Sequence, residues 1–279
     1  MYIFRFIIII YSFVIFFARC ASENEHSFGE TEINKHTKLH QKRAVVLERN
    51  GLKLTEIVDY PRFSEAKLLL LSDNIRFSPG LNVLEFKIEN FTLGAVTADQ
   101  EKFYQNDVLA VQNMVIINNK KLVKQITETS AQVDLSMGEN KIFVFLNRSF
   151  NVGLKNPESS LFFKVNIDDK GSSFESLLPD SILYVTQPRG SYIGPNAEKV
   201  IFDFMLHNVK LEKGYYVSLN INDIEFKIDF YAPFWIEGLG YGRHKIAVYL
   251  KDSEGKIINS IINPDNEYYI ELKELSLFD

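Results

Sequence analysis

The chain repeats one pattern of strands at two places, and this repeat constrains its fold more than any other feature. Residues 83–94 read VLEFKIENFTLG and residues 201–211 read IFDFMLHNVKL, so apolar side chains alternate in step and Asn90 aligns with Asn208. Residues 138–149 (GENKIFVFLNRS) match residues 242–253 (GRHKIAVYLKDS) in the same way. The first pair is 118 residues apart and the second 104. A period this long indicates tandem domains and not a solenoid of short repeats.

Both copies alternate apolar and polar residues with a period of two. Leu84, Phe86 and Ile88 point one way while the charged residues between them point the other, and residues 246–250 follow the same rule. This period predicts half-buried antiparallel strands. Short strands between turns rich in Gly, Asn, Asp and Pro indicate sandwiches or small barrels. We therefore predict an all-β chain with domains at 44–168 and 174–279, joined by a polar linker at Asp168–Ser173.

The first 19 residues are typical of a secretory signal peptide. Phe6–Ala18 is an apolar run interrupted only by Ser12 and is too short to span a bilayer comfortably. Cys20, the only cysteine, stands where a bacterial lipoprotein signal places the residue that is lipidated after cleavage, although Phe17 and Arg19 depart from the usual pattern. We expect export and lipidation at Cys20. The alternatives are ordinary cleavage near Ala21–Ser22 and an uncleaved anchor.

Residues 20–43 are polar and lack any periodicity, which predicts a disordered tether. The folded part is expected to begin at Ala44, where Asn50-Gly51 between two apolar runs predicts a tight hairpin turn. One cysteine cannot form an intramolecular disulfide, so stability must come from the core. A formal net charge of −5 argues against nucleic acid as a partner, because phosphate binding needs clustered Lys and Arg.

The first copy contains an insertion at residues 95–110 (AVTADQEKFYQNDVLA). It joins two strands that the second copy connects tightly through Glu212-Lys213-Gly214. A loop of this length on a compact domain is either functional or partly disordered. The segment Thr97–Asp107 is therefore one of two places where we expect a ligand to bind.

No catalytic motif is present: the sequence lacks G-x-S-x-G, H-E-x-x-H, a Walker loop and G-x-G-x-x-G. We predict no enzymatic activity, no cofactor and no metal site, since the five histidines do not cluster, and we expect His207 and His244 to be solvated. The second candidate binding site is an aromatic group in the second copy. The alternative interpretation is that its Phe and Trp are packing residues of the core or of the domain junction. The group consists of Tyr231, Phe234, Trp235, Tyr241 and Arg243.

Long runs of both copies resemble an uncharacterised bacterial surface-lipoprotein family. In the second copy these are LYVTQPRGSYIGPNAEKVIFDFMLHNVKL and APFWIEGLGYGRHKIAVYLKDSEGKII, and in the first NGLKLTEIVDYPRFSEAKL and FVFLNRSFNVGLKNPES, so the resemblance covers about Asn50 to Leu272. It implies tandem immunoglobulin-like β-sandwich modules. Some members are labelled phosphopeptide-binding, but recognition of phosphate needs converging donors, and only the scattered Arg148, Arg189 and Arg243 are found.

One departure from the family concerns Gln112 and Met114, which stand where members often have a His-x-His pair before an Asn-Asn turn. If relatives bind a metal or a polar ligand through that pair, the resemblance implies that this chain has lost or altered the capacity.

The sequence predicts a non-catalytic, exported and lipid-anchored binding or assembly protein of the bacterial outer membrane or cell surface, or of the periplasm if it is not lipidated. Its partner would be an envelope protein, a peptide or a glycan. One alternative is a periplasmic metal or small-ligand carrier that uses the insertion. Another is a structural accessory subunit whose edge strands pair with a partner.

Overall fold

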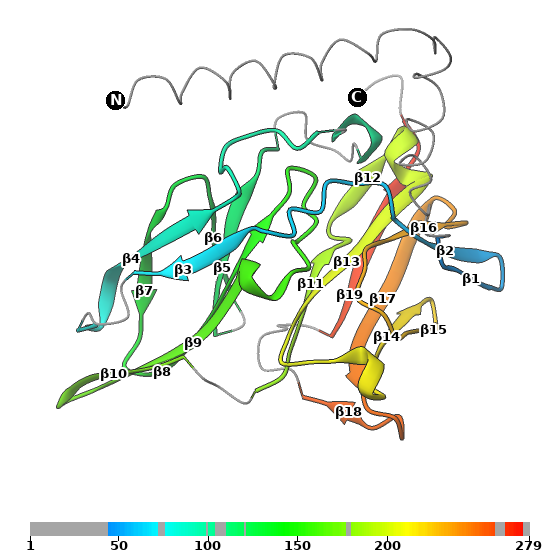
Figure 1. Cartoon of the computed structure of the whole chain (residues 1–279). Helices are drawn as coiled ribbons and strands as arrows, with labels where there is room; N and C mark the ends of the chain where they lie inside the picture. Colours follow the sequence, from blue (N-terminus) through cyan, green and yellow to red (C-terminus); the bar gives the residue numbers. More distant parts are fainter. Residues whose placement is uncertain are drawn as a thin grey trace, which may run out of the picture. The chain divides into compact units, whose positions relative to one another are not determined.

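Two pairs of facing β-sheets make up the described part of the chain (Figure 1). The computed structural model describes residues 44–71, 76–98, 100–103, 110–119, 121–176, 180–259 and 266–275. The predicted signal peptide, Cys20 and the predicted tether lie outside these ranges. Within them every regular element is a strand or a short 3-10 helix. The prediction of an all-β chain built from antiparallel sheets is confirmed, with one parallel pair, β12–β19.

The first sandwich packs a three-stranded sheet against a five-stranded one, and alternate residues of the two sheets fill a common core that includes Leu84, Phe86, Ile142 and Val144. The smaller sheet has the order β3 (Lys67–Leu70), β4 (Gly80–Glu89), β7 (Ser130–Leu135). The larger has the order β10 (Gly171–Glu175), β9 (Ser160–Asp168), β8 (Gly138–Asn147), β5 (Asn113–Asn118), β6 (Lys121–Ile126).

The second sandwich packs two larger sheets around a core that includes Phe202, Phe204, Val217 and Val248. One sheet has the order β1 (Val46–Arg49), β2 (Leu52–Glu56), β16 (Phe234–Glu237), β13 (Lys199–His207), β11 (Ile182–Gln187). The other has the order β12 (Ser191–Ile193), β19 (Glu267–Lys273), β17 (Gly242–Lys251), β14 (Tyr216–Ile221), β15 (Ile224–Ile228), and β18 (Ile257–Ile258) pairs with β17. The 3-10 helices are η1 (Gln100–Phe103), η2 (Pro157–Ser159), η3 (Gly194–Ala197) and η4 (Leu211–Lys213).

The sequence repeat is also a repeat of strand order. The order β3-β4-β7 recurs as β11-β13-β16, and β9-β8-β5-β6 recurs as β19-β17-β14-β15. The aligned asparagines show why the repeat includes polar positions. Asn90 and Asn208 both adopt left-handed backbone conformations, with φ of 56° and 54°, which asparagine tolerates better than most residues. Their side-chain amides donate to the carbonyls of Glu65 and Asp180, so each asparagine ends the same strand in its copy.

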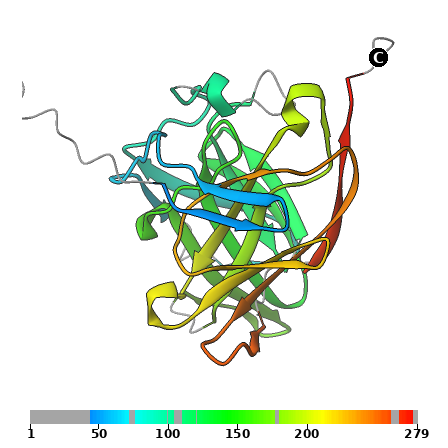
Figure 2. The same ribbon diagram turned by 90° about the vertical axis from the view of Figure 1, so that its right-hand side faces the viewer.

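The hairpin of β1 and β2 joins a sheet of the second sandwich, although in sequence it precedes the first sandwich. Its turn is the predicted one, with φ of 48° at Asn50 and 80° at Gly51. β2 then pairs with β16, so that Leu54 lies opposite Ile236. Figures 1 and 2 both show this blue hairpin alongside the second sandwich. These residues fall in the predicted first domain because they are contiguous with it in sequence, whereas β2 is hydrogen-bonded to a strand of the second sandwich.

The predicted linker is also part of a hairpin. In the segment Asp168–Ser173, β9 ends at Asp168 and β10 begins at Gly171, and the two strands pair directly across the turn. The polar, glycine-containing sequence that suggested a linker is equally suited to a tight turn. The other limits of the two domains stay a prediction.

The two sandwiches meet face to face through an apolar layer. It joins side chains of β5, β8 and β9 to side chains of β11 and β13, and all of them are buried. Along each strand, the residues of this layer alternate with residues that face the core of the sandwich to which the strand belongs. The layer consists of Val115, Ile117, Phe143, Phe145, Phe162, Ile182, Tyr184 and Met205.

A buried polar cluster lies within the same junction. Asp203 of β13, fully buried, forms an ion pair with Lys155 of the first sandwich at 2.7 Å. Its other carboxylate oxygen accepts hydrogen bonds from the backbone N–H of Gly153 at 3.0 Å and from the hydroxyl of Thr186. Arg148, 1% exposed, donates to the carbonyls of two chain segments, and burial lowers the pKa of its guanidinium to about 10. Charged groups from both sandwiches thus depend on the junction for their partners.

Candidate functional site

The insertion lies in the connection from β4 to β5, and its described parts have a hollow on each side. The equivalent connection from β13 to β14 is short, contains η4 and turns at Gly214, whose φ is 93°. The predicted contrast between a long loop in the first copy and a tight one in the second is therefore confirmed. Residue 99 and residues 104–109 of the insertion lie outside the described ranges.

Three aromatic rings stack where the insertion meets the second sandwich. Phe103, at the end of η1, lies 4.2 Å from Phe150 and 5.8 Å from Trp235 between ring centroids, with interplanar angles of 17° and 9°. Phe103 and Phe150 belong to a buried cluster, and Trp235 packs against it while remaining only partly buried. Trp235 points outward from β16 because Phe234 and Ile236 on either side point into the core. The two regions that the sequence identified separately therefore meet at one stack.

A hollow of about 590 Å³ opens beside Trp235. Its lining combines this one aromatic ring with charged and amide side chains from η1, η3 and the start of β13. Two rim lysines are held by ion pairs, Lys102 with Asp59 at 3.5 Å and Lys199 with Glu237 at 3.2 Å. The arrangement therefore offers a fixed aromatic surface with polar groups around it. The lining residues are Glu101, Lys102, Pro195, Asn196, Glu198, Lys199 and Trp235.

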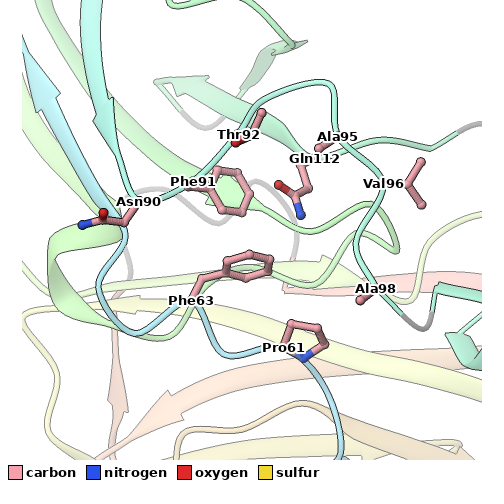
Figure 3. Close-up of a pocket in the computed structure, with 9 residues that line it drawn as sticks. All are labelled: Pro61, Phe63, Asn90, Phe91, Thr92, Ala95, Val96, Ala98 and Gln112. Carbon is pink, nitrogen blue, oxygen red and sulfur yellow. The ribbon is translucent and has the colours of Figure 1, made fainter.

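A second hollow, of about 540 Å³, lies on the other side of the insertion (Figure 3). Phe63 and Phe91 form its aromatic part, with ring centroids 5.0 Å apart and ring planes at 84°. Ala95, Val96 and Ala98 of the insertion line it from the opposite side, and the amide of Gln112 lies beside the ring of Phe91 in Figure 3. This hollow is predominantly apolar.

Gln112 and Met114 have structural roles in this chain. Met114 is fully buried in the core of the first sandwich. The Gln112 amide donates to the hydroxyl of Thr97 at 3.1 Å, and Thr97 exchanges hydrogen bonds with Ser149. These bonds attach the start of the insertion to the residue before β5 and to the turn that follows β8. The described residues contain no group of three or more His, Cys, Asp and Glu side chains placed to hold a metal ion.

The prediction that His207 and His244 are solvated is wrong. His207 does leave the core of its own sandwich, but it packs against the rings of Phe143 and Phe162 in the first sandwich. This burial lowers the pKa of His207 below its ordinary value. His244, 9% exposed, is hydrogen-bonded to the Asn222 side chain at 2.8 Å and to the Gly240 carbonyl at 2.7 Å. The outward phase of a strand does not imply solvent where a neighbouring sheet or loop covers that face.

The five predicted binding residues do not form one surface. Phe234 is fully buried in the second core. The Tyr231 hydroxyl accepts a hydrogen bond from the Leu206 backbone at 3.0 Å, and burial raises its pKa above the ordinary range. Tyr241 is 57% exposed and precedes β17, where the Arg243 guanidinium lies 3.9 Å from the ring centroid of Tyr269.

Of the predicted group, Trp235 lines the hollow beside the insertion and rests on the ring of Phe103. Phe103 lies in the predicted insertion, but its sequence context predicted no role for it. Its signal was weak, because Phe103 is a single phenylalanine in the polar run QEKF. Ligand binding by any of the five residues stays a prediction.

In the described part of the chain, no helix has the length and apolar character that crossing a membrane would require. No family model matches the sequence, and no curated protein matches it. Among solved structures, fibronectin(III)-like modules of Clostridium thermocellum CbhA match 74% of this chain and 94% of their own, at 11% identity and a TM-score of 0.25. The Bacteroides ovatus protein SGBP-B, solved with a mixed-linkage heptasaccharide, matches 75% of this chain and 71% of its own, at 6% identity and a TM-score of 0.24. Likeness at these scores carries no argument about function.

Proposed function

We propose that this chain is a non-catalytic binding protein, exported and lipid-anchored on a bacterial cell, that captures a glycan in the hollow beside Trp235. One observation carries the proposal: the Trp235 ring is held parallel to Phe103 and still lines an open hollow with a polar rim. A rigid aromatic face accepts the apolar face of a sugar ring, and side chains around it hydrogen-bond the hydroxyls.

The charges of the rim support an uncharged glycan. The lining carries two charged groups of each sign: the carboxylates are Glu101 and Glu198, and the lysines are Lys102 and Lys199. A ligand with a net charge would gain from one pair and be repelled by the other. Asn196 adds an amide that can both donate and accept. Such a rim matches hydroxyl groups better than it matches an ionic ligand.

The experiment measures binding of neutral oligosaccharides of glucose, xylose and mannose to the full chain purified in detergent. Trp235 is the only tryptophan, so its fluorescence reports directly on the hollow. We expect a saturable change in emission with at least one class of oligosaccharide. By calorimetry, Trp235→Ala should weaken that binding by more than about tenfold, because central aromatic anchors contribute about 2 kcal/mol or more. Trp235→Phe should retain part of it.

The matched control is Tyr241→Ala, which removes an exposed aromatic ring from the loop before β17. This variant should bind as the parent does. Unchanged affinity of a folded Trp235→Ala chain would refute the proposal, as would the absence of saturable binding across the panel.

A second candidate function is favoured by the hollow in Figure 3, whose lining of Phe63, Phe91 and Val96 suits a small apolar ligand. The chain would then act as a carrier that uses the insertion. Val96→Asp changes an exposed lining residue and should abolish retention of such a ligand, measured by mass spectrometry of the purified protein, while oligosaccharide binding is unaffected. If the Val96→Asp protein still retains the apolar ligand, the proposed carrier function is refuted.

Lipid anchoring rests on the sequence of residues 1–20. Mass spectrometry of the mature N-terminus tests it. The expected species begins at an acylated Cys20, whereas a chain that begins at Ala21 or later without acyl mass would contradict the proposed anchor.

A further inference from the structure

A third cavity, of about 650 Å³, lies where the two sandwiches meet, away from Trp235. Most of its lining comes from the β8–β9 connection of the first sandwich and from the end of β13 and the β13–β14 connection of the second, and Tyr231 of the β15–β16 connection completes it. These segments are far apart in sequence and meet only in the folded chain. The lining residues are Lys155, Asn156, Pro157, Ser160, Leu206, His207, Asn208, Val209, Lys210, Leu211, Lys213, Tyr215 and Tyr231.

The lining is cationic. Lys155, Lys210 and Lys213 contribute ammonium groups, and among the side chains that the structure describes no carboxylate lines the cavity. Lys210 and Lys213 are exposed, and neither forms an ion pair with a carboxylate in the described part of the chain. This composition differs from the rim beside Trp235, where the charges balance. The chain as a whole is acidic, with a formal net charge of −5, and Lys155 is already paired with Asp203, so the unpaired positive charge of this lining comes from Lys210 and Lys213.

Lys155 is held in place by the junction. Its ammonium group pairs with Asp203 at 2.7 Å and donates to the carbonyl of Phe204 at 2.5 Å. An ammonium group has three donors, and the remaining contact is the sulfur of Met205 at 3.8 Å, a weak acceptor. Burial lowers the pKa of Lys155, and a second anion near the ammonium group would oppose that shift. The buried end of the cavity therefore has donor capacity that this chain fills poorly.

The rest of the wall is apolar or aromatic. Leu206, Val209 and Leu211 line it beside Tyr215, and the ammonium group of Lys155 lies 4.8 Å from the ring centroid of Tyr231. A bare inorganic ion would leave this surface without a partner. A ligand with both an anionic group and a carbon skeleton would contact both parts of the wall.

We propose that this cavity binds a small organic anion, with its carboxylate or phosphate group against Lys155, Lys210 and Lys213 and its carbon skeleton against the apolar wall. Lysine provides a compact point charge and does not by its geometry distinguish carboxylate from phosphate. A long polyanion is disfavoured because the rest of the surface is acidic. This proposal is independent of glycan binding beside Trp235.

The experiment compares four probes on the full chain by calorimetry: glucuronate, glucose 6-phosphate, glucose and inorganic phosphate. At least one of the two organic anions should bind in a saturable way, and which of them binds more tightly identifies the anionic group. Glucose should not bind here, and inorganic phosphate should bind more weakly than the organic anion. Raising the salt concentration toward 1 M should weaken the binding, because ionic contacts at an open cavity are screened.

The test variant is Lys210→Gln/Lys213→Gln, which removes two exposed charges without disturbing the core. We expect a loss of affinity of roughly tenfold for the organic anion, since each partly exposed ionic contact contributes modestly. The matched control is Lys121→Gln/Lys124→Gln, which removes the same charge from exposed positions on β6. Equal affinity of the two variants would overturn the proposal. So would no binding of either organic anion, or glucose binding that Lys210→Gln/Lys213→Gln weakens as much as it weakens anion binding.

Discussion

Removing the carboxylate of Asp203 should loosen the junction between the sandwiches. In Asp203→Ala the ammonium group of Lys155 loses its ion pair, and the buried N–H of Gly153 and the hydroxyl of Thr186 lose their acceptor. The apolar layer around them stays intact, because alanine at position 203 leaves Val115, Phe145 and the other members of the layer unchanged.

The magnitude follows from the groups that are left without partners. A buried donor that loses its acceptor costs about 1–3 kcal/mol, and removing one member of a buried ion pair costs about 3–5 kcal/mol in total. We therefore expect Asp203→Ala to lower the free energy of unfolding by about 3–5 kcal/mol. For a folded part of this size each kcal/mol lowers Tm by about 2–4 °C, so Tm should fall by roughly 6–20 °C.

A second substitution separates the ion pair from the rest of the cost. Lys155→Met in the Asp203→Ala background removes the unpaired ammonium group, so the double variant should be more stable than Asp203→Ala alone. Urea unfolding followed by the fluorescence of Trp235, beside the junction, and by circular dichroism gives the four free energies of the cycle. A loss below about 1 kcal/mol for Asp203→Ala, or a double variant less stable than both single ones, would refute this account of the junction.

Three further changes test other parts of the structure. Gly238→Ala should lower the free energy of unfolding by at least about 2 kcal/mol, because φ is 88° there and a Cβ would lie 2.2 Å from the Gly51 carbonyl oxygen. The control Gly240→Ala, whose Cβ would meet nothing within 4 Å, should leave Tm nearly unchanged. Equal losses of stability in the two variants would contradict the role of the close approach at Gly238. Phe103→Ala removes the middle ring of the stack, so it should lower the free energy of unfolding in urea by about 3–5 kcal/mol and shift the fluorescence emission of Trp235 to longer wavelength. Unaltered emission would mean that Phe103 does not cover Trp235. Burial lowers the pKa of His207 below its ordinary value of 6.5, so as pH decreases the unfolded chain takes up a proton before the folded chain does, and stability should fall below about pH 6.5. His207→Gln should make Tm depend less steeply on pH, and an unchanged dependence would assign it to other groups.

Local and periodic features of this fold could be predicted from the sequence, but contacts between distant segments could not. The alternation around Leu84 and Phe86 gave the strands, and Asn50-Gly51 gave the first turn, because both signals act over a few residues. The pairing of β2 with β16 has no such local signal. The hairpin has an apolar face that would fit either sandwich, and only the partner strand decides which one it joins.

The same limit explains why the candidate site could be predicted only in part. A tryptophan next to Phe234 in an alternating run must face outward, so its phase was predictable, whereas its contact with Phe103 depends on the insertion folding back over β16. The cationic cavity was not found either, since Lys155 and Lys210 are contributed by different sandwiches. The outward histidines were misassigned for the same reason: a period of two identifies the face of a strand but not what covers that face.

The position of the β1–β2 hairpin imposes an order of assembly on the chain. The whole first sandwich lies in the sequence between β2 and the strand that β2 pairs with. During synthesis from the N-terminus, Leu52 and Leu54 emerge early and must wait for β16, while the first sandwich has all its own strands available sooner. Pairings between distant segments are slow to form and leave apolar surface exposed in the meantime. We expect the first sandwich to form before the second, and the hairpin to be the segment most prone to wrong association until the C-terminal part of the chain arrives.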